Sequence, residues 1–158
     1  MEFPDVAADT EVPTRYVSRA IVYDETHEGY RFLLLKTGKG YWQNPQGGVD
    51  PGESGLEASL RETTEETALS DLKPMPWSEH RDAYMTEREG EPIYAVLTAY
   101  AVKADSSRPV ALSLEDKHED YEWVSFKEAR SRLTRYPEQR RVFDTVLLKA
   151  GICEDYNP

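Results

Sequence analysis

Three glutamates are spaced so that a helix would bring their side chains together. Glu62, Glu65 and Glu66 stand at i, i+3 and i+4, which places them on one helix face. Like charges at this spacing destabilise a helix by roughly 0.2–0.5 kcal/mol per pair. Arg61 is the only Lys or Arg within residues 48–72. Although such clusters are usually plain solvated surfaces, a divalent cation would relieve the repulsion, and carboxylate oxygens suit Mg²⁺ or Mn²⁺.

The loop before the predicted helix supports the metal hypothesis. It contains the adjacent glycines Gly47 and Gly48, whose bare backbone allows close approach by a metal ion or a phosphate group. Glu53 lies just before the helix and is expected to form an ion pair with Arg61, one or two turns further on. Such a pair would fix the loop to the helix.

Residues 47–69 resemble the Nudix box. That box reads Gly, five residues, Glu, seven residues, Arg-Glu, an apolar residue, any residue, Glu-Glu, any residue, Gly and an apolar residue. The corresponding positions here are Gly47, Glu53, Arg61, Glu62, Thr63, Glu65, Glu66, Ala68 and Leu69. Two positions depart from the pattern, because Thr63 replaces the apolar residue and Ala68 replaces the glycine. Neither departure falls on the acidic face.

The resemblance implies a reaction and a set of roles. Nudix hydrolases cleave a nucleoside diphosphate linked to another group, using two or three divalent ions, for which we expect Mg²⁺ or Mn²⁺. By position, Glu65 and Glu66 would be the principal metal ligands, and Glu62 a further ligand or a base for water. The Gly47 carbonyl would add a ligand, and Arg61 would orient the carboxylates. The ions would activate water and neutralise phosphate charge for in-line attack on phosphorus.

A second, later segment bears on the substrate. The segment YWQNPQGGVDPGE is similar to diadenosine tetraphosphate hydrolases and to bacterial RNA 5′-pyrophosphohydrolases. His118, Tyr121 and Trp123 match the spacing of a later motif in the diadenosine tetraphosphate hydrolases, and His118 is a candidate substrate contact. Tyr121 and Trp123 fit a strand with alternating core residues equally well.

The resemblance also leaves one metal ligand open. In the diadenosine tetraphosphate hydrolases an acidic residue directly precedes the histidine, and Lys117 stands there in this chain. Glu115 would take the place of that residue if two residues were inserted, and Glu119 is the other candidate. Tyr84 and Tyr94 match ring-bearing positions and are candidates for base stacking or for simple sheet packing. Arg81 and Lys39 are candidate phosphate contacts or ordinary surface charges.

The pattern of the whole chain predicts an α/β fold. Strands are predicted at residues 16–23, 31–36, 78–86, 92–102 and 121–124, with residues 38–52 irregular. A helix is predicted from the cap Ser54, with Glu57 completing a capping box, for about 13 to 15 residues until LKPMPW stops it. Helices are also predicted over residues 126–133 and 137–150. Strands interleaved with helices favour a Nudix-type α/β/α sandwich, with a mixed sheet between helices.

Length and composition set the limits of the interpretation. The 158 residues predict a flexible lead-in at 1–13, one Nudix domain at 14–152 and a tail at 153–158. The net charge of −11 disfavours nonspecific nucleic-acid binding, so the expected partner is a small nucleotide. The single cysteine, Cys153, excludes an internal disulfide, and no apolar run is long enough to span a membrane. We therefore expect a cytoplasmic protein; its oligomeric state is left open.

Two classes of function remain. The first is a metal-dependent pyrophosphohydrolase, with diadenosine tetraphosphate, cleaved to ATP and AMP, as the preferred substrate. Nucleoside or deoxynucleoside triphosphates, dihydroneopterin triphosphate and triphosphorylated RNA ends are alternatives within this class. The second is a Nudix-fold nucleotide sensor without catalysis. A sensor would be expected to lose glutamates of the box, and this chain keeps all of them.

Overall fold

The computed structural model describes residues 12–113, 115 and 118–152. The strands are β1 (Thr14–Thr26), β2 (Gly29–Thr37), β3 (Trp42–Gln43), β4 (Gln46–Gly48), β5 (Lys73–Arg88), β6 (Glu91–Lys103) and β7 (His118–Val124). The helices are α2 (Gly55–Thr67), α3 (Phe126–Arg132) and α4 (Pro137–Ala150). The predicted lead-in and tail fall largely outside the described residues, as does Cys153.

The strands form one mixed sheet, as the sequence predicted. Its order is β3-β2-β1-β6-β5, with β4 added beside β1 and β7 beside β2. β1 runs parallel to β6, whereas the other pairings are antiparallel. β4 is held next to β1 by the pairs of Val17 with Gly48, Ser18 with Gly47, and Arg19 with Gln46. This pairing positions the glycine loop.

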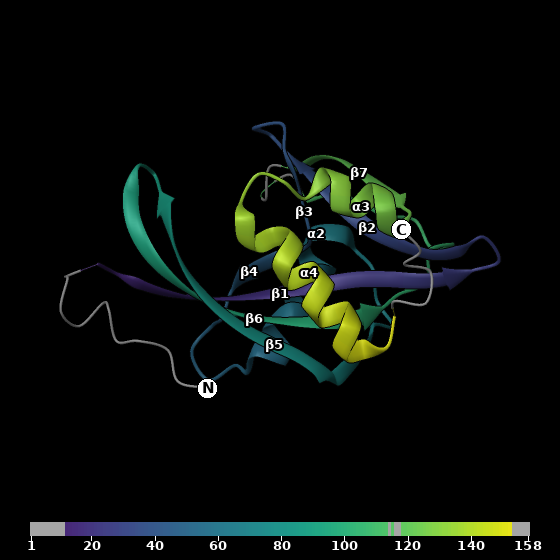
Figure 1. Ribbon diagram of the computed structural model, residues 1–158, viewed down its shortest axis with the longest axis horizontal. Helices are drawn as coiled ribbons and strands as arrows, with labels where there is room; N and C mark the ends of the chain where they lie inside the picture. The colour runs from purple at the N-terminus through teal and green to yellow at the C-terminus, as the bar shows by residue number, and fades with distance from the viewer. Residues whose placement is uncertain (1–11, 114, 116–117, 153–158) are drawn as a thin grey trace.

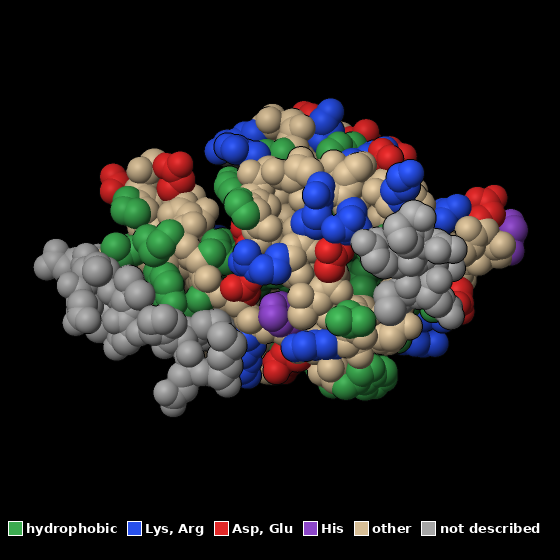
Figure 2. All heavy atoms as spheres, viewed as in Figure 1, with side chains coloured by type: hydrophobic (Ala, Val, Ile, Leu, Met, Phe, Trp, Pro, Cys, Tyr) green, Lys and Arg blue, Asp and Glu red, His purple; other side chains and the backbone are tan. Residues whose placement is uncertain are grey.

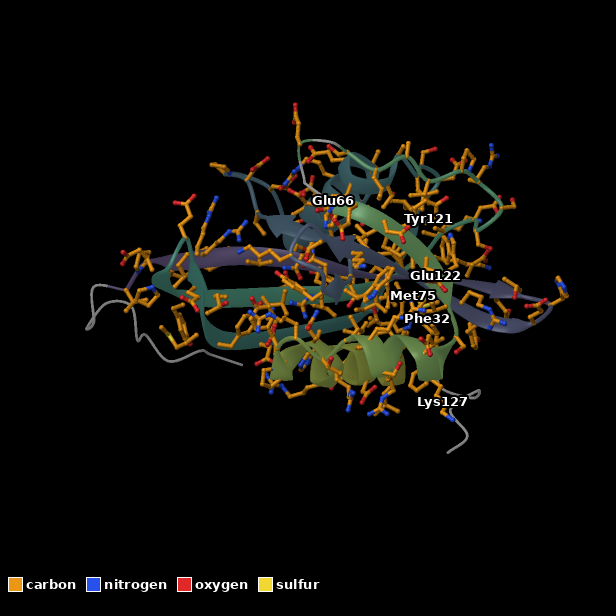
Figure 3. All side chains as sticks on the ribbon, turned by 90° about the horizontal axis from the view of Figure 1, so that it is seen from above. Phe32, Glu66, Met75, Tyr121, Glu122 and Lys127 are labelled. Atoms are coloured by element: carbon orange, nitrogen blue, oxygen red, sulfur yellow. The ribbon has the colours of Figure 1, made fainter. Side chains whose placement is uncertain are left out.

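Helices cover both faces of the sheet (Figures 1 and 3). Alternate strand residues point to opposite faces, and each face has its own apolar core. Leu97, Ala99 and Ala101 of β6 pack in a cluster with α3 and α4, whereas Tyr100 and Val102 belong to a cluster under α2. Figure 3 shows α4 on one side of the sheet and Glu66 of α2 on the other. The α/β/α sandwich is therefore confirmed.

The structure corrects two local expectations. The segment 38–52, expected to be irregular, contains the short strands β3 and β4. The LKPMPW segment, expected only to stop the helix, begins β5 at Lys73. Its prolines are tolerated because β5 lies at the edge of the sheet, and the register shifts between Met75 and His80. Among the described residues, no helix is long and apolar enough to cross a membrane.

Candidate active site

Helix α2 starts and packs as its sequence predicts. The Ser54 hydroxyl accepts from the Glu57 N–H at 3.0 Å, and the Glu57 carboxylate accepts from the Ser54 N–H at 2.9 Å. This capping box fixes the first turn. Thr63, which stands at the apolar position of the box, is fully buried, and its hydroxyl donates to the Ser59 carbonyl at 2.7 Å. The departure at Thr63 is therefore accommodated inside the helix, away from the acidic face.

Arg61 is the centre of the acidic cluster. Its guanidinium donates to both oxygens of Glu53, at 2.7 and 2.9 Å, so the expected ion pair is present. It also donates to Glu62 at 2.8 Å, to Glu65 at 3.2 Å and to the Gly48 carbonyl at 2.9 Å. One cation thus ties the loop to two of the three helical glutamates.

These contacts set the charge state of the cluster. The hydrogen bonds from Arg61 and then from the Asp50 N–H lower the pKa of Glu53 to about 2. The bond to Glu53, followed by those to Glu62 and Glu65, raises the pKa of Arg61. Both groups therefore stay charged throughout the neutral range, and the loop remains attached to the helix by a bidentate ion pair.

Glu66 is held differently from Glu65. Its carboxylate accepts from the Gln46 N–H of β4 at 3.0 Å, and the residue is only 4% exposed. The side chain of Glu65 is 53% exposed. Gly47 is packed against the third glutamate, since a Cβ placed there would lie 2.1 Å from the carboxyl carbon of Glu62. The glycine at this position therefore leaves room for the Glu62 carboxylate.

The donors suit a divalent ion in kind, although they are not assembled into a ready site. Among the described residues, no three His, Cys, Asp or Glu side chains stand close enough together to hold a metal. Arg61 instead holds the carboxylates of Glu62 and Glu65. Hard carboxylate oxygens and a loop shaped around Glu62 nevertheless fit Mg²⁺ or Mn²⁺. The residues that would hold the ion are Glu62, Glu65, Glu66 and the Gly47 carbonyl.

A cleft lies on the opposite face of the sheet from α2. Gln46 of β4 lines it, and so do residues from β1, the hairpin of β5 and β6, and the start of α4. Its charged and aromatic lining is Arg15, Arg19, Tyr41, Tyr84, Glu87, Arg88, Tyr136 and Glu138. Desolvation and then the charge of Arg88 lower the pKa of Arg15, while burial raises the pKa of Tyr84. β4 therefore stands between an acidic helix face and a cleft that carries arginines and tyrosines.

The candidate substrate contacts from the sequence do not all meet at this cleft. Tyr84 lines it, but Tyr94 does not, because the neighbours of Tyr94 along β6, Ile93 and Ala95, are the ones that face the cleft. Arg81 forms an ion pair with Glu79 at 3.6 Å, outside the lining.

The remaining candidates lie in the turn between β2 and β3 and around β7. Lys39 is exposed in the turn before β3 and does not line the cleft. His118 lies beside Gln43, with 2.9 Å between its Nε2 and the Gln43 Nε2, and Gln43 lines the cleft. Glu119 is paired with Lys36 at 3.8 Å, and Glu115 is exposed before β7. Lys117 lies outside the described residues.

Several lining residues were not among the candidates from the sequence. Arg15 and Arg19 lie four residues apart on β1. Tyr136 and Glu138 come from the start of α4. The sequence did contain a signal for Arg15 and Arg19. Both stand at odd-numbered positions of one strand region, so the alternation of side chains places them on the same face of the sheet.

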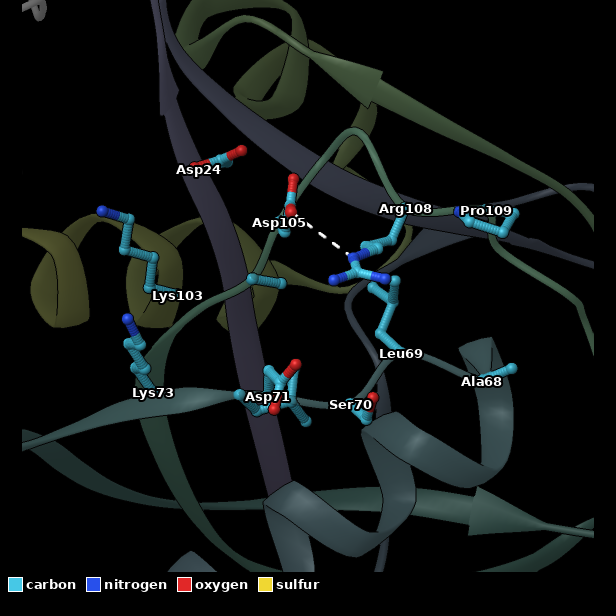
Figure 4. Close-up of a pocket in the computed structure, with 12 residues that line it drawn as sticks. Asp24, Ala68, Leu69, Ser70, Asp71, Lys73, Lys103, Asp105, Arg108 and Pro109 are labelled. Carbon is cyan, nitrogen blue, oxygen red and sulfur yellow. Dashed lines mark ion pairs between the residues drawn. The ribbon is translucent and has the colours of Figure 1, made fainter.

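A larger hollow lies at the other end of α2 (Figure 4). It is lined by residues 68–73, 103–105, 108–109 and Asp24, with an ion pair between Arg108 and Asp105 at 3.6 Å. Ala68 and Leu69 end the box there, but none of its acidic residues lines this hollow. The carboxylates of the box therefore lie near β4, away from this hollow.

The fold and the acidic loop–helix define a Nudix hydrolase. Residues 13–146 match the NUDIX domain family, and the chain belongs to that family. It is accordingly a pyrophosphohydrolase acting on phosphoric anhydride bonds, a class of enzymes that generally uses divalent metal ions.

The chain is also similar to individual proteins of this family. The asymmetrical bis(5′-nucleosyl)-tetraphosphatase of Mus musculus is 31% identical over 113 residues, which cover 69% of this chain and 73% of the relative. An RNA pyrophosphohydrolase of Erythrobacter litoralis is 61% identical over 59 residues, covering 35% of this chain and 36% of the relative. A C. elegans Ap4A hydrolase complex shares the fold, with a TM-score of 0.72, 23% identity and coverage of 87% of this chain and 98% of that chain.

Proposed function

We propose that the protein hydrolyses a dinucleoside polyphosphate, with diadenosine tetraphosphate cleaved to ATP and AMP. The observation that carries the proposal is the position of Gln46, whose backbone holds Glu66 while the residue lines the cleft. A substrate with a phosphate chain and a base could reach both sides of β4. The match to tetraphosphatases over more than two thirds of the chain supports the same substrate class.

The glutamates are assigned to the metal end of the site. Glu65 and Glu66 would be the main ligands, with Glu62 as a further ligand or as the base that accepts a proton from water. The Gly47 carbonyl would complete the set. When bound, a divalent ion supplies charge neutralisation and an acidified water. Since Glu65 is half exposed, we propose that it leaves Arg61 to bind the ion.

Arg61 and Glu53 act as supports in this proposal. Their bidentate pair holds the loop against the helix, and Arg61 orients Glu62 from 2.8 Å. Glu119 or Glu115 would add a carboxylate from the β7 side. A carboxylate held by an arginine can exchange that partner for a metal ion without leaving a buried charge unpaired.

The cleft is assigned to the rest of the substrate. Tyr84 offers a ring for a base, and Arg15 and Arg88 offer positive charge for phosphates. His118 would act through Gln43 at the edge of the cleft. Tyr94, Arg81 and Lys39 lie outside the lining and are not assigned a contact here.

A substrate panel tests the proposal. The purified protein would be incubated with Mg²⁺ or Mn²⁺ and with diadenosine tetraphosphate, nucleoside triphosphates, dihydroneopterin triphosphate or a triphosphorylated RNA, and products read by chromatography. We expect ATP and AMP from diadenosine tetraphosphate, at the highest kcat/KM of the panel. Glu65→Gln should lower kcat at least 100-fold, about 2.7 kcal/mol, because a ligand is lost.

Glu128→Gln is the matched control for Glu65→Gln. Glu128 is also a half-exposed helical glutamate paired with an arginine, Arg132, at 2.9 Å. Its replacement should leave kcat unchanged. Survival of diadenosine tetraphosphate while triphosphates or RNA ends are cut would refute the substrate assignment. Nucleotide binding without any turnover would instead favour the sensor.

A further inference from the structure

Arg19 of β1 is a buried charge in the wall of the cleft. The residue is 2% exposed, and its Nη2 lies 3.6 Å from Oε1 of Glu138, whose side chain is 7% exposed. A buried ion pair is a weak source of stability, because desolvation offsets the attraction, and apolar residues of similar volume often serve as well. The Arg19 Nη1 is buried and has no hydrogen-bond partner among the described residues. Packing therefore gives no sufficient reason for an arginine here.

One contact of Arg19 leads to the metal-binding carboxylates, while its Nη2 donates to the Tyr84 hydroxyl of the cleft at 3.4 Å. Its Nε donates to Oε1 of Gln46 at 2.7 Å, and the two residues are direct partners in the β1–β4 ladder. The backbone N–H of that same Gln46 donates to Glu66 at 3.0 Å. Glu138 in α4 thus reaches Glu66 in α2 through two residues, across the full thickness of the sheet.

A second buried polar residue, Asn44, precedes Gln46 by two positions in the chain. Asn44 is 1% exposed, and neither atom of its amide group has a hydrogen-bond partner among the described residues. Asn44 directly precedes Pro45, whose carbonyl accepts from the Ala20 N–H, and Gln46, whose N–H donates to Glu66. Arg19 lies beside the same segment, opposite Gln46 in the ladder. Unsatisfied buried polar groups cost stability and concentrate where function requires them. Here such groups stand opposite Gln46 in the ladder (Arg19) and two residues before it in the chain (Asn44).

We propose that Arg19, anchored by Glu138, is a positioning residue that fixes Gln46 and thereby aims Glu66 at the divalent ion. It touches neither the ion nor the reacting atoms. The inference rests on the proposed metal-dependent hydrolysis, and it assigns a role to a residue outside the box. Groups that orient metal ligands typically change metal affinity by about 10–100-fold when they are replaced.

The test measures Mn²⁺ binding by itself, without nucleotide. Arg19→Lys keeps a charge beside Glu138 but loses the planar fork that grips Gln46. Gln46→Ala removes the accepting side chain and keeps the backbone N–H. Each should weaken Mn²⁺ binding about 10-fold in an equilibrium titration. The double variant should be no weaker than either single variant, because both changes break one connection.

Arg141→Lys is the matched control. Arg141 forms an ion pair with Asp82 at 2.7 Å between α4 and β5, away from β4. Its replacement should leave the Mn²⁺ affinity unchanged, and thermal unfolding would report on the fold of all four variants. Should Arg19→Lys not fold, Gln46→Ala still tests the connection, since it removes no buried charge.

The outcomes separate this inference from the proposed function. Unchanged Mn²⁺ affinity in Arg19→Lys and Gln46→Ala, or additive losses in the double variant, would overturn the positioning role. A raised KM with unchanged Mn²⁺ affinity would also overturn it, because Arg19 would then act on the substrate. Weakened Mn²⁺ binding in a protein that cleaves no polyphosphate would uphold the positioning role and refute the proposed function.

Discussion

At the scale of single residues, two adjacent glycines have unequal roles. A Cβ on Gly47 would meet the Glu62 carboxylate at 2.1–2.4 Å, whereas a Cβ on Gly48 would meet nothing closer than an Arg15 nitrogen at 3.7 Å. Gly47→Ala should therefore push Glu62 out of place. Because the displaced atoms end a side chain that can move, we expect a loss of at least 10-fold in kcat/KM (about 1.4 kcal/mol) with little loss of thermal stability.

Gly48→Ala provides the comparison for Gly47→Ala. It adds the same methyl group one residue further on, in ordinary van der Waals space. Its kcat/KM should stay within about twofold of the wild type, a difference below ~0.5 kcal/mol. Equal losses in the two variants would mean that the loop backbone, and not the room around Glu62, limits activity.

The acidic cluster shows what could be predicted residue by residue. The spacing of Glu62, Glu65 and Glu66 and the pair of Glu53 with Arg61 are local, so helix periodicity was enough to anticipate them. The different exposure of Glu65 and Glu66, in contrast, does not depend on local sequence. Glu66 is buried because β4 lies over it. The pairing of β4 with β1 holds the Gln46 N–H where it can donate to Glu66 of α2.

At the scale of elements, the end of α2 is strained. Ala68 takes the position of the box glycine and adopts φ 63°, the left-handed conformation that glycine accepts without cost. Ala68→Gly should relieve this strain and stabilise the protein by about 0.5–1 kcal/mol, after allowing for the greater freedom of glycine in the unfolded chain. The unfolding midpoint should rise by about 1–4 °C, as read by calorimetry or circular dichroism.

Ala150→Gly is the opposite case. Ala150 lies in the last turn of α4, which already ends at a left-handed glycine, Gly151. A second glycine should destabilise by about 0.5–1 kcal/mol. If Ala68→Gly also lowered the midpoint, packing of the Ala68 methyl group would outweigh the backbone strain.

The elements were predictable where their patterns are periodic. α2 and α4 carry caps and regular apolar spacing, and both were found at the expected places. β3 and β4 were missed because two or three residues show no period. They are strands only through their pairing, β3 with the preceding strand β2 and β4 with the more distant β1. The prolines of β5 were interpreted only as the end of the helix. Prolines are accepted in an edge strand, but the sequence does not reveal that β5 will lie at the edge of the sheet.

At the scale of the whole molecule, the charge is uneven. The formal net charge is −11, yet Lys and Arg side chains gather over α3 and α4 on the face shown in Figure 2. Several of these are neutralised locally, as in the pairs of Arg130 with Asp144 and Arg132 with Glu122. Arg15 and Arg88 differ, since neither is within ion-pair distance of a described carboxylate, although the charge of Glu62 acts favourably on Arg15. The cleft lining therefore carries three arginines against two glutamates, Glu87 and Glu138, and is net positive within an acidic protein.

The positive charge of the cleft should favour substrate binding and lower the stability of the fold, because Arg15 and Arg88 repel each other. Arg88→Gln removes a repulsion with Arg15, so the unfolding midpoint should stay level or rise. The KM for a polyphosphate substrate should rise about 10-fold, or ~1.4 kcal/mol, with kcat nearly unchanged, because a charge-assisted contact is lost. Steady-state kinetics at two salt concentrations would check the cause, as the KM of the wild type should respond more steeply to salt.

Arg81→Gln distinguishes the two possible binding surfaces. Arg81 lies on the same strand as Arg88, but it pairs with Glu79 and lies outside the cleft lining. If the substrate occupies the cleft, Arg81→Gln should leave KM within about twofold of the wild type, less than ~0.5 kcal/mol. A larger effect from Arg81 than from Arg88 would move the substrate away from the cleft. It would leave the glutamates of α2 as the centre of the reaction, because their assignment depends on β4 and Arg61 and not on the arginines of β5.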